Sequence, residues 1–193
     1  MNNEEFERVF SGHRQRLRAM LGLRMDPRLR ERIDISDILQ EAYLEAHRRR
    51  GEYDANQMPP YLWLRMIAGQ KLVDVHRHHL QAKKRTMLRE VRMMERGMPE
   101  ASSIDLAAEL ADSMTSVTKA VIRAEVRLKV EEALSQLQAI DREVLALRHF
   151  EQLTNAEVAQ VLNLSPTAAS NRYVRAIKKL RDALPSDISG EAI

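Results

Sequence analysis

The chain has 193 residues, of which 44% are hydrophobic, 4% aromatic and 31% charged, and its formal net charge is +3. This length suits one ordinary domain or two small ones, and the composition favours small helical units with wide solvated faces. The absence of cysteine excludes disulfide bonds, thiol catalysis and cysteine-bound zinc. The sequence begins MNNEEFERVF, which is no signal-peptide pattern, and no apolar run approaches membrane-spanning length. We therefore expect a cytoplasmic protein that does not associate with membranes.

Helical periodicity is nearly continuous along the chain, and strand patterns are absent. The first predicted helix ends at Asp26 and Pro27, and its apolar stripe consists of Phe6, Phe10, Leu17 and Met20 or Leu21. A second helix is predicted over 35–49, and a turn-rich break follows it at 51–60. A third helix is predicted over 60–85, with an apolar first half buried between other helices and a polar, basic second half presented to a partner.

The pattern changes at residues 86–118, where Gly97, Pro99 and an acidic bias interrupt the periodicity. We interpret this segment as a flexible linker that has room for a short amphipathic helix at 104–111. Regular spacing then returns and predicts a long helix over about 122–137, followed by a shorter one.

These elements predict an all-α fold made of two small helical domains. The first domain is expected to cover residues 1–85 and the second residues 119–186, with a tail at 187–193.

Two successive helix starts lie close together in TNAEVAQVLNLSPTAASNRYVRAIKKL, residues 154–180. Thr154 and Glu157 match a capping box, in which each side chain bonds the other residue's backbone amide. Asn163 tolerates a left-handed backbone and suits a helix end. Ser165 and Pro166 then have the residue types of an N-cap and a first helical position. Two capped helices separated by a few residues predict a helix-turn-helix.

The second helix of this motif has two different faces. Its predicted packing stripe consists of Ala169, Tyr173, Ile177, Leu180 and Leu184. Its opposite face carries Thr167, Ser170, Asn171, Arg172, Arg175, Lys178 and Lys179. In DNA-binding helix-turn-helix proteins the start of this helix enters the major groove, so short polar side chains meet base edges and basic ones meet phosphates. A helical hairpin with a solvated face is the alternative, but the double cap and the one-sided basic face favour DNA binding.

With these residues the chain resembles the ECF (extracytoplasmic function) group of bacterial RNA polymerase sigma factors. Residues 141–184 are similar to region 4 of the family, and DISDILQEAYLEAHRR (34–49) and YLWLRMIAGQKLVDVHRHH (61–79) are similar to region 2. The resemblance implies a protein that is not an enzyme, needs no cofactor, and directs promoter-specific initiation by core RNA polymerase. The implied partners are the beta-prime and beta subunits, promoter DNA and, in some members, an anti-sigma factor.

The resemblance also implies three sets of site residues. The helix that docks onto the polymerase beta-prime subunit carries Asp37, Gln40 and Glu41. The helix that opens the minus-ten element and captures an extruded base contributes Gln70, Asp74, Arg77, His78, Lys83, Lys84 and Arg85. The helix that reads the minus-thirty-five element contributes Thr167, Ala168, Ser170, Asn171, Arg172, Arg175 and Lys178. In this last set the arginines are expected to contact phosphates and the small residues at the helix start to contact bases.

Other functions remain as alternatives with less support. His76, His78 and His79 suggest a metal site, but no HExxH pattern or acidic cluster accompanies them. No nucleophile–base pattern or phosphate-binding glycine loop indicates an enzyme. The main competitor is a stand-alone helix-turn-helix regulator that binds duplex operators as a dimer. An interaction protein, such as an anti-sigma partner, is a third reading that the basic helix disfavours.

Overall fold

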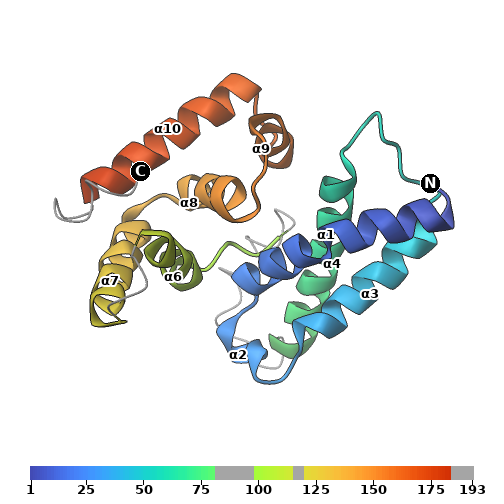
Figure 1. Ribbon diagram of the computed structural model, residues 1–193, viewed down its shortest axis with the longest axis horizontal. Coiled ribbons are helices and arrows are strands. Elements are labelled where there is room, and N and C mark those ends of the chain that lie inside the picture. The colour runs from blue at the N-terminus through green and yellow to red at the C-terminus, as the bar shows by residue number, and fades with distance from the viewer. Residues whose placement is uncertain (81–97, 115–119, 184–193) are drawn as a thin grey trace. The chain divides into compact units, whose positions relative to one another are not determined.

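The computed structural model describes residues 1–80, 98–114 and 120–183, and its regular elements in these ranges are helices, with no strand among them (Figure 1). The chain divides into two compact units, Met1–Glu100 and Ala101–Ile193. The all-α fold with two helical units that the sequence predicts is therefore confirmed. Within the described ranges, no helix combines the length and the apolar character that crossing a membrane requires.

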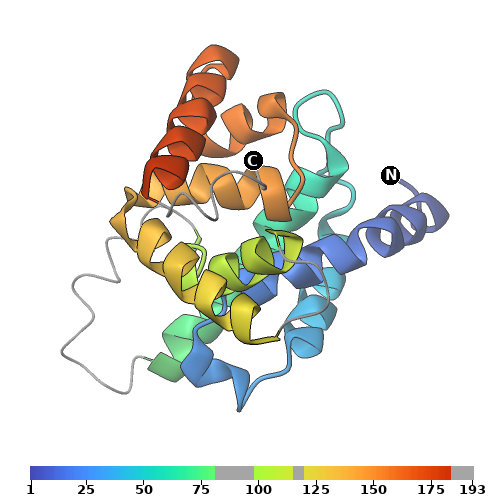
Figure 2. The same cartoon turned by 60° about the vertical axis from the view of Figure 1, so that its left-hand side comes forward.

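The first unit is a small bundle in which α1, α3 and α4 all contact one another, as Figures 1 and 2 show for the neighbouring α1 and α3. Its helices are α1 (Asn3–Arg24), α2 (Pro27–Arg30), α3 (Ile35–Arg49) and α4 (Pro60–Leu80). The core between them is built from apolar stripes at helical spacing, as predicted, and its fully buried members include Phe6, Leu17, Met20, Leu21, Ile38, Ile67 and Leu72.

Local signals in the sequence account for where these helices begin. Asn2 and Glu5 form a capping box at the start of α1, and Asp34 accepts a hydrogen bond from the Ser36 amide at the start of α3. Asp26 caps α2, which has Pro27 in its first turn, so α1 ends where the sequence predicts.

The burial of α4 differs from the prediction that its first half is buried all round. Met66 in that half is 36% exposed, whereas Leu72 and His76 in the second half are buried. The reason is that α4 packs on both α1 and α3, so one side of the helix is covered along most of its length. The opposite side forms a continuous exposed stripe.

The second unit contains the helix-turn-helix and the helices that support it. Its elements are α6 (Ser103–Met114), α7 (Ala120–Gln136), α8 (Ala139–Leu145), a π-helical turn η1 (Ala146–Phe150), α9 (Asn155–Leu162) and α10 (Pro166–Ala183). In this unit α6 packs on α7, and α10 contacts both α8 and α9 (Figure 1). The helix predicted near Asp141 is present but begins at Ala139, and the π-helical turn that continues it was not predicted.

The segment 86–118 is not a linker throughout. Residues 86–97 and 115–118 lie outside the described residues, but α6 occupies most of the rest and is longer than the short helix allowed at 104–111. Leu106, Ala107 and Ala111 have no exposed surface and form the stripe that packs on α7. Two of these three residues are alanines, which give a weak hydrophobic signal. Gly97 and Pro99 precede them in sequence, so the pattern indicated a linker instead of a full helix.

Candidate nucleic-acid interface

Three capping interactions set the geometry of the helix-turn-helix. The Thr154 hydroxyl accepts a hydrogen bond from the Glu157 amide at 3.2 Å, and the Glu157 carboxylate accepts one from the Thr154 amide at 2.7 Å. Asn163 ends α9 in the left-handed region, at φ 52° and ψ 48°. The Ser165 hydroxyl accepts a hydrogen bond from the Ala168 amide at 3.1 Å and caps α10. The caps predicted from the sequence are confirmed.

Side chains at the turn and along one side of α10 hold that helix in place. The Asn155 amide group donates a hydrogen bond to the Pro166 carbonyl at 2.8 Å, which ties the start of α9 to the start of α10. Ala169 and Leu180 from the predicted stripe are buried, and so is Ala176, which the sequence analysis missed. Tyr173 and Ile177 are half-buried at the edges of this stripe, and Leu184 lies outside the described residues.

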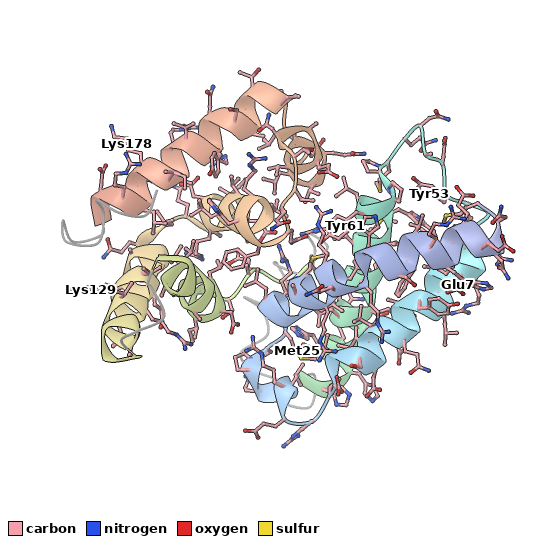
Figure 3. The ribbon with its side chains drawn as sticks, in the orientation of Figure 1. Glu7, Met25, Tyr53, Tyr61, Lys129 and Lys178 are labelled. Atoms are coloured by element: carbon pink, nitrogen blue, oxygen red, sulfur yellow. The ribbon has the colours of Figure 1, made fainter. Side chains whose placement is uncertain are left out.

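The outward side of α10 presents the predicted base-contact residues together with basic side chains. Its exposed members are Thr167, Ser170, Asn171, Val174, Arg175 and Lys178, followed by Arg181 and Asp182 near the end of the helix, and Ala168 is half-buried beside them. Figure 3 shows Lys178 on the side of α10 that faces away from α8. Val174, which is 61% exposed, was not predicted. The sequence does contain a signal for its exposure: Val174 lies one turn beyond Ser170 and Asn171, which places it on the polar face of the helix.

Arg172 is placed differently from the phosphate contact predicted for it. Its guanidinium donates a hydrogen bond to Asp141 Oδ1 at 3.0 Å, and the Lys179 ammonium donates one to Asp141 Oδ2 at 2.7 Å. Asp141 lies in the first turn of α8 and is 2% exposed. Both cations therefore point toward α8 rather than away from it. Arg172 follows the buried Ala169 by three residues, which places it at the edge of the packing stripe.

A second polar contact joins α10 to the π-helical turn. The Tyr173 hydroxyl lies 3.2 Å from His149 Nε2, and the Arg148 guanidinium lies 5.3 Å from the centre of the Tyr173 ring. Arg148 also donates a hydrogen bond to the Leu153 carbonyl at 2.7 Å. Partial removal from water lowers the pKa of His149, and the charge of Arg148 lowers this pKa further. These contacts favour a neutral His149 that supports the middle of α10.

The predicted minus-ten residues within the described range share one side of α4. Gln70, Asp74, Arg77 and His78 are all exposed, and Asp74 lies four residues after Gln70, three before Arg77 and four before His78, with Met66 one turn before Gln70. Helical geometry brings residues at these spacings together into one stripe. The remaining members of the set, Lys83, Lys84 and Arg85, lie outside the described residues.

The three histidines of α4 do not form a cluster. His76 is 6% exposed, and its Nε2 accepts a hydrogen bond from the Asp26 amide at 3.3 Å. Burial lowers the pKa of His76 against the opposing charge of Asp26. His78 and His79 are exposed, with ring centres 4.9 Å apart. Among the described residues, no group of three metal-ligating side chains could hold an ion.

The predicted polymerase-binding residues are exposed on α3. Asp37, Gln40 and Glu41 are all accessible, and Leu44, one turn further along, is 53% exposed. Helical spacing puts the four residues on one surface. An exposed leucine beside two carboxylates makes this surface part apolar and part acidic, and the sequence analysis did not identify Leu44.

Comparison with known proteins agrees with the helix-turn-helix of the second unit. The sequence model of the family described as "Sigma-70, region 4" matches residues 127–180. The chain is 30% identical over 145 residues to the ECF RNA polymerase sigma factor SigK of Mycobacterium ulcerans, which covers 75% of this chain and 69% of that protein. It is 27% identical over 154 residues to the RNA polymerase sigma factor CnrH of Cupriavidus metallidurans, with coverage of 80% and 75%. The RNA polymerase sigma-E factor of Streptomyces avermitilis is 26% identical over 166 residues, with coverage of 83% and 77%. The chain therefore belongs to the ECF family of RNA polymerase sigma factors.

Proposed function

We propose that the protein binds core RNA polymerase and directs promoter-specific initiation, reading the minus-thirty-five element as duplex and favouring the melted minus-ten element. The observation that carries this proposal is the outward side of α10, which is polar at its start and basic further along in a doubly capped helix-turn-helix. The protein does no chemistry in this account, since the polymerase makes the RNA. It acts where the polymerase acts, in the cytoplasm.

Reading of the minus-thirty-five element is assigned to α10 and its supporting helices, within residues 119–186. Thr167, Ser170 and Asn171 lie at the start of the helix, where a major-groove helix meets base edges. Arg175 and Lys178 follow on the same side and reach the phosphates on either side of the groove. Val174, which lies between Asn171 and Arg175 in sequence, suits an apolar contact with a thymine methyl group.

Opening of the minus-ten element is assigned to the exposed stripe of α4, within residues 1–85. Extruding a base costs a few kcal/mol of unstacking and unpairing, so the protein must bind the melted state more tightly than the duplex. Gln70 and Asp74 supply hydrogen-bonding groups for the extruded base. Arg77 and His78 lie one turn further along, where they hold the sugar–phosphate backbone. Lys83, Lys84 and Arg85 continue the basic segment in sequence.

Docking onto the polymerase is assigned to the exposed side of α3. Asp37 and Glu41 provide negative charge for basic residues of the beta-prime subunit, and Gln40 provides a hydrogen-bonding group between them. Leu44 adds an apolar contact at the same surface. The beta subunit is a further proposed partner, and an anti-sigma factor that covers the exposed side of α3 or of α10 would block assembly.

The experiment that tests the role of α10 compares two substitutions on its outward side. Asn171→Ala should change base preference at one promoter position by about 1–3 kcal/mol, because it removes a hydrogen bond to a base edge. Arg175→Ala should weaken binding to all sequences alike and lower the salt slope by about one, because it removes a phosphate contact. Both are measured by holoenzyme binding to a promoter library. Equal effects of the two variants on every sequence would contradict the assignment.

A further inference from the structure

The carboxylate of Asp141 binds two cations that the sequence places on the DNA-facing helix. Its Oδ1 accepts a hydrogen bond from Arg172 at 3.0 Å, and its Oδ2 accepts one from Lys179 at 2.7 Å. Arg172 and Lys179 are seven residues apart on α10, which is two helical turns, so one carboxylate can reach both. The Asp141 side chain is 3% exposed, and those of Arg172 and Lys179 are 26% and 49% exposed.

Interactions within and next to α8 hold the Asp141 carboxylate in place beside these two cations. Asp141 lies in the first turn of α8, where the helix dipole favours a negative charge. The neighbouring Arg142 donates a hydrogen bond to the Leu137 carbonyl at 2.6 Å and so fixes the start of α8 to the end of α7. A buried carboxylate without a cation is strongly unfavourable. If both cations left Asp141, its charge would remain buried and uncompensated, so the folded unit favours the paired state.

Arg175 and Lys178 have no such restraint. Within the described part of the chain neither side chain has a carboxylate partner, and Arg175 bonds only the Asn171 carbonyl, at 3.3 Å. Both are exposed. These four basic residues of α10 therefore separate into an inward pair bound to Asp141 and an outward pair open to DNA.

We propose that Asp141 is a positioning residue that withholds Arg172 and Lys179 from the DNA backbone. This inference rests on the proposed role of α10 at the minus-thirty-five element. Sequence-independent affinity for duplex comes from cations that displace counterions from phosphates, and each such cation steepens the salt dependence of log K by about 0.9. By withholding two cations, Asp141 keeps this sequence-independent affinity low, so that base contacts supply a larger share of the total binding free energy. It also fixes the rotation of α10 about its own axis.

The test measures the affinity of the full chain for a fluorescent duplex without promoter sequence as a function of salt. Asp141→Asn keeps the size of the side chain but removes the charge that binds the two cations. We expect it to bind this duplex more tightly than wild type and with a salt slope steeper by about 0.9 to 1.8. Asp182→Asn makes the same charge change at an exposed position of α10 and should leave the slope unchanged. A purely structural role for Asp141 predicts weaker binding without a steeper slope.

Lys179→Gln provides a second measurement that does not depend on the folding of the Asp141 variant. Lys179 is half exposed, so this substitution should not disturb the fold. In the wild-type background this substitution should leave the slope unchanged, because the ammonium is already occupied. In the Asp141→Asn background it should remove about 0.9 of the gained slope. A loss of about 0.9 on Lys179→Gln alone would overturn the proposal. So would an unchanged or flatter slope in an Asp141→Asn protein whose circular dichroism is native.

The two proposals fail in different ways. If Asn171→Ala still alters base preference while Asp141→Asn leaves the slope unchanged, the role of Asp141 is wrong and that of α10 stands. If the chain binds no duplex, alone or with core polymerase, the role of α10 is wrong, and the role of Asp141 is wrong with it.

Discussion

Leu106→Ala tests whether α6 is part of the folded second unit rather than a linker. Leu106 has no exposed surface and lies on the stripe of α6 that packs on α7. The substitution removes three carbon groups, which at about 0.8 kcal/mol each gives about 2.4 kcal/mol of lost burial. The cavity left behind adds to this value, and Leu→Ala changes in cores cost about 2–5 kcal/mol. We therefore expect the free energy of unfolding of the second unit to fall by about 3 kcal/mol.

The chain offers a matched control and a way to assign the effect to one unit. Ile104 is on the same helix but is 45% exposed, so Ile104→Ala should cost much less than Leu106→Ala. The single tryptophan, Trp63, lies in α4 of the first unit. In a urea titration, Leu106→Ala should lower the midpoint of a transition seen by circular dichroism and leave the Trp63 fluorescence transition in place. Equal, small effects of the two substitutions would show that α6 adds nothing to the fold.

Three further predictions follow from individual contacts. Thr154→Ala should lower the stability of the second unit by about 1 kcal/mol in the same titration, since it removes a cap, and Thr154→Ser should retain it; equal stability of all three proteins would refute the cap. Because burial lowers the pKa of His76 in the folded state, stability of the first unit should be full above the unfolded pKa of about 6.5 and decline as the pH falls below it. The Trp63 transition measured at pH 7.5 and 5.5 should show this loss, and His76→Gln should reduce it; an equal loss in that variant would assign the effect elsewhere. Asp37→Lys should abolish association with core polymerase in a pull-down while leaving circular dichroism unchanged, whereas Glu31→Lys, an exposed charge reversal outside α3, should not; normal binding by Asp37→Lys would remove that residue from the interface.

Much of the fold could be predicted because the signals are local. The boundaries of α3, the capping box at Thr154 and the left-handed Asn163 all depend on residues within a few positions of one another. The apolar stripe of α1 follows from periodicity alone. The extent of α6 was not predictable in the same way, because Gly97 and Pro99 precede it and its buried stripe includes two alanines.

The candidate site shows a different limit. Periodicity places Arg172 and Lys179 on the basic side of α10, and only the folded unit brings Asp141 beside them from 31 and 38 residues away. Val174 and Leu44 were missed because exposure of an apolar residue depends on which neighbours cover it. The stripe of Gln70, Asp74, Arg77 and His78 was predictable, since one helix carries all four residues.

The most direct test of the account is transcription in vitro by core polymerase across a promoter library, with and without the purified chain. We predict initiation that depends on the chain, occurs at promoters sharing a minus-thirty-five and a minus-ten element, and is lost when the α3 surface is changed by Asp37→Lys. A chain that leaves the polymerase unchanged but selects a palindromic duplex without it would be a stand-alone regulator, and this result would contradict the account.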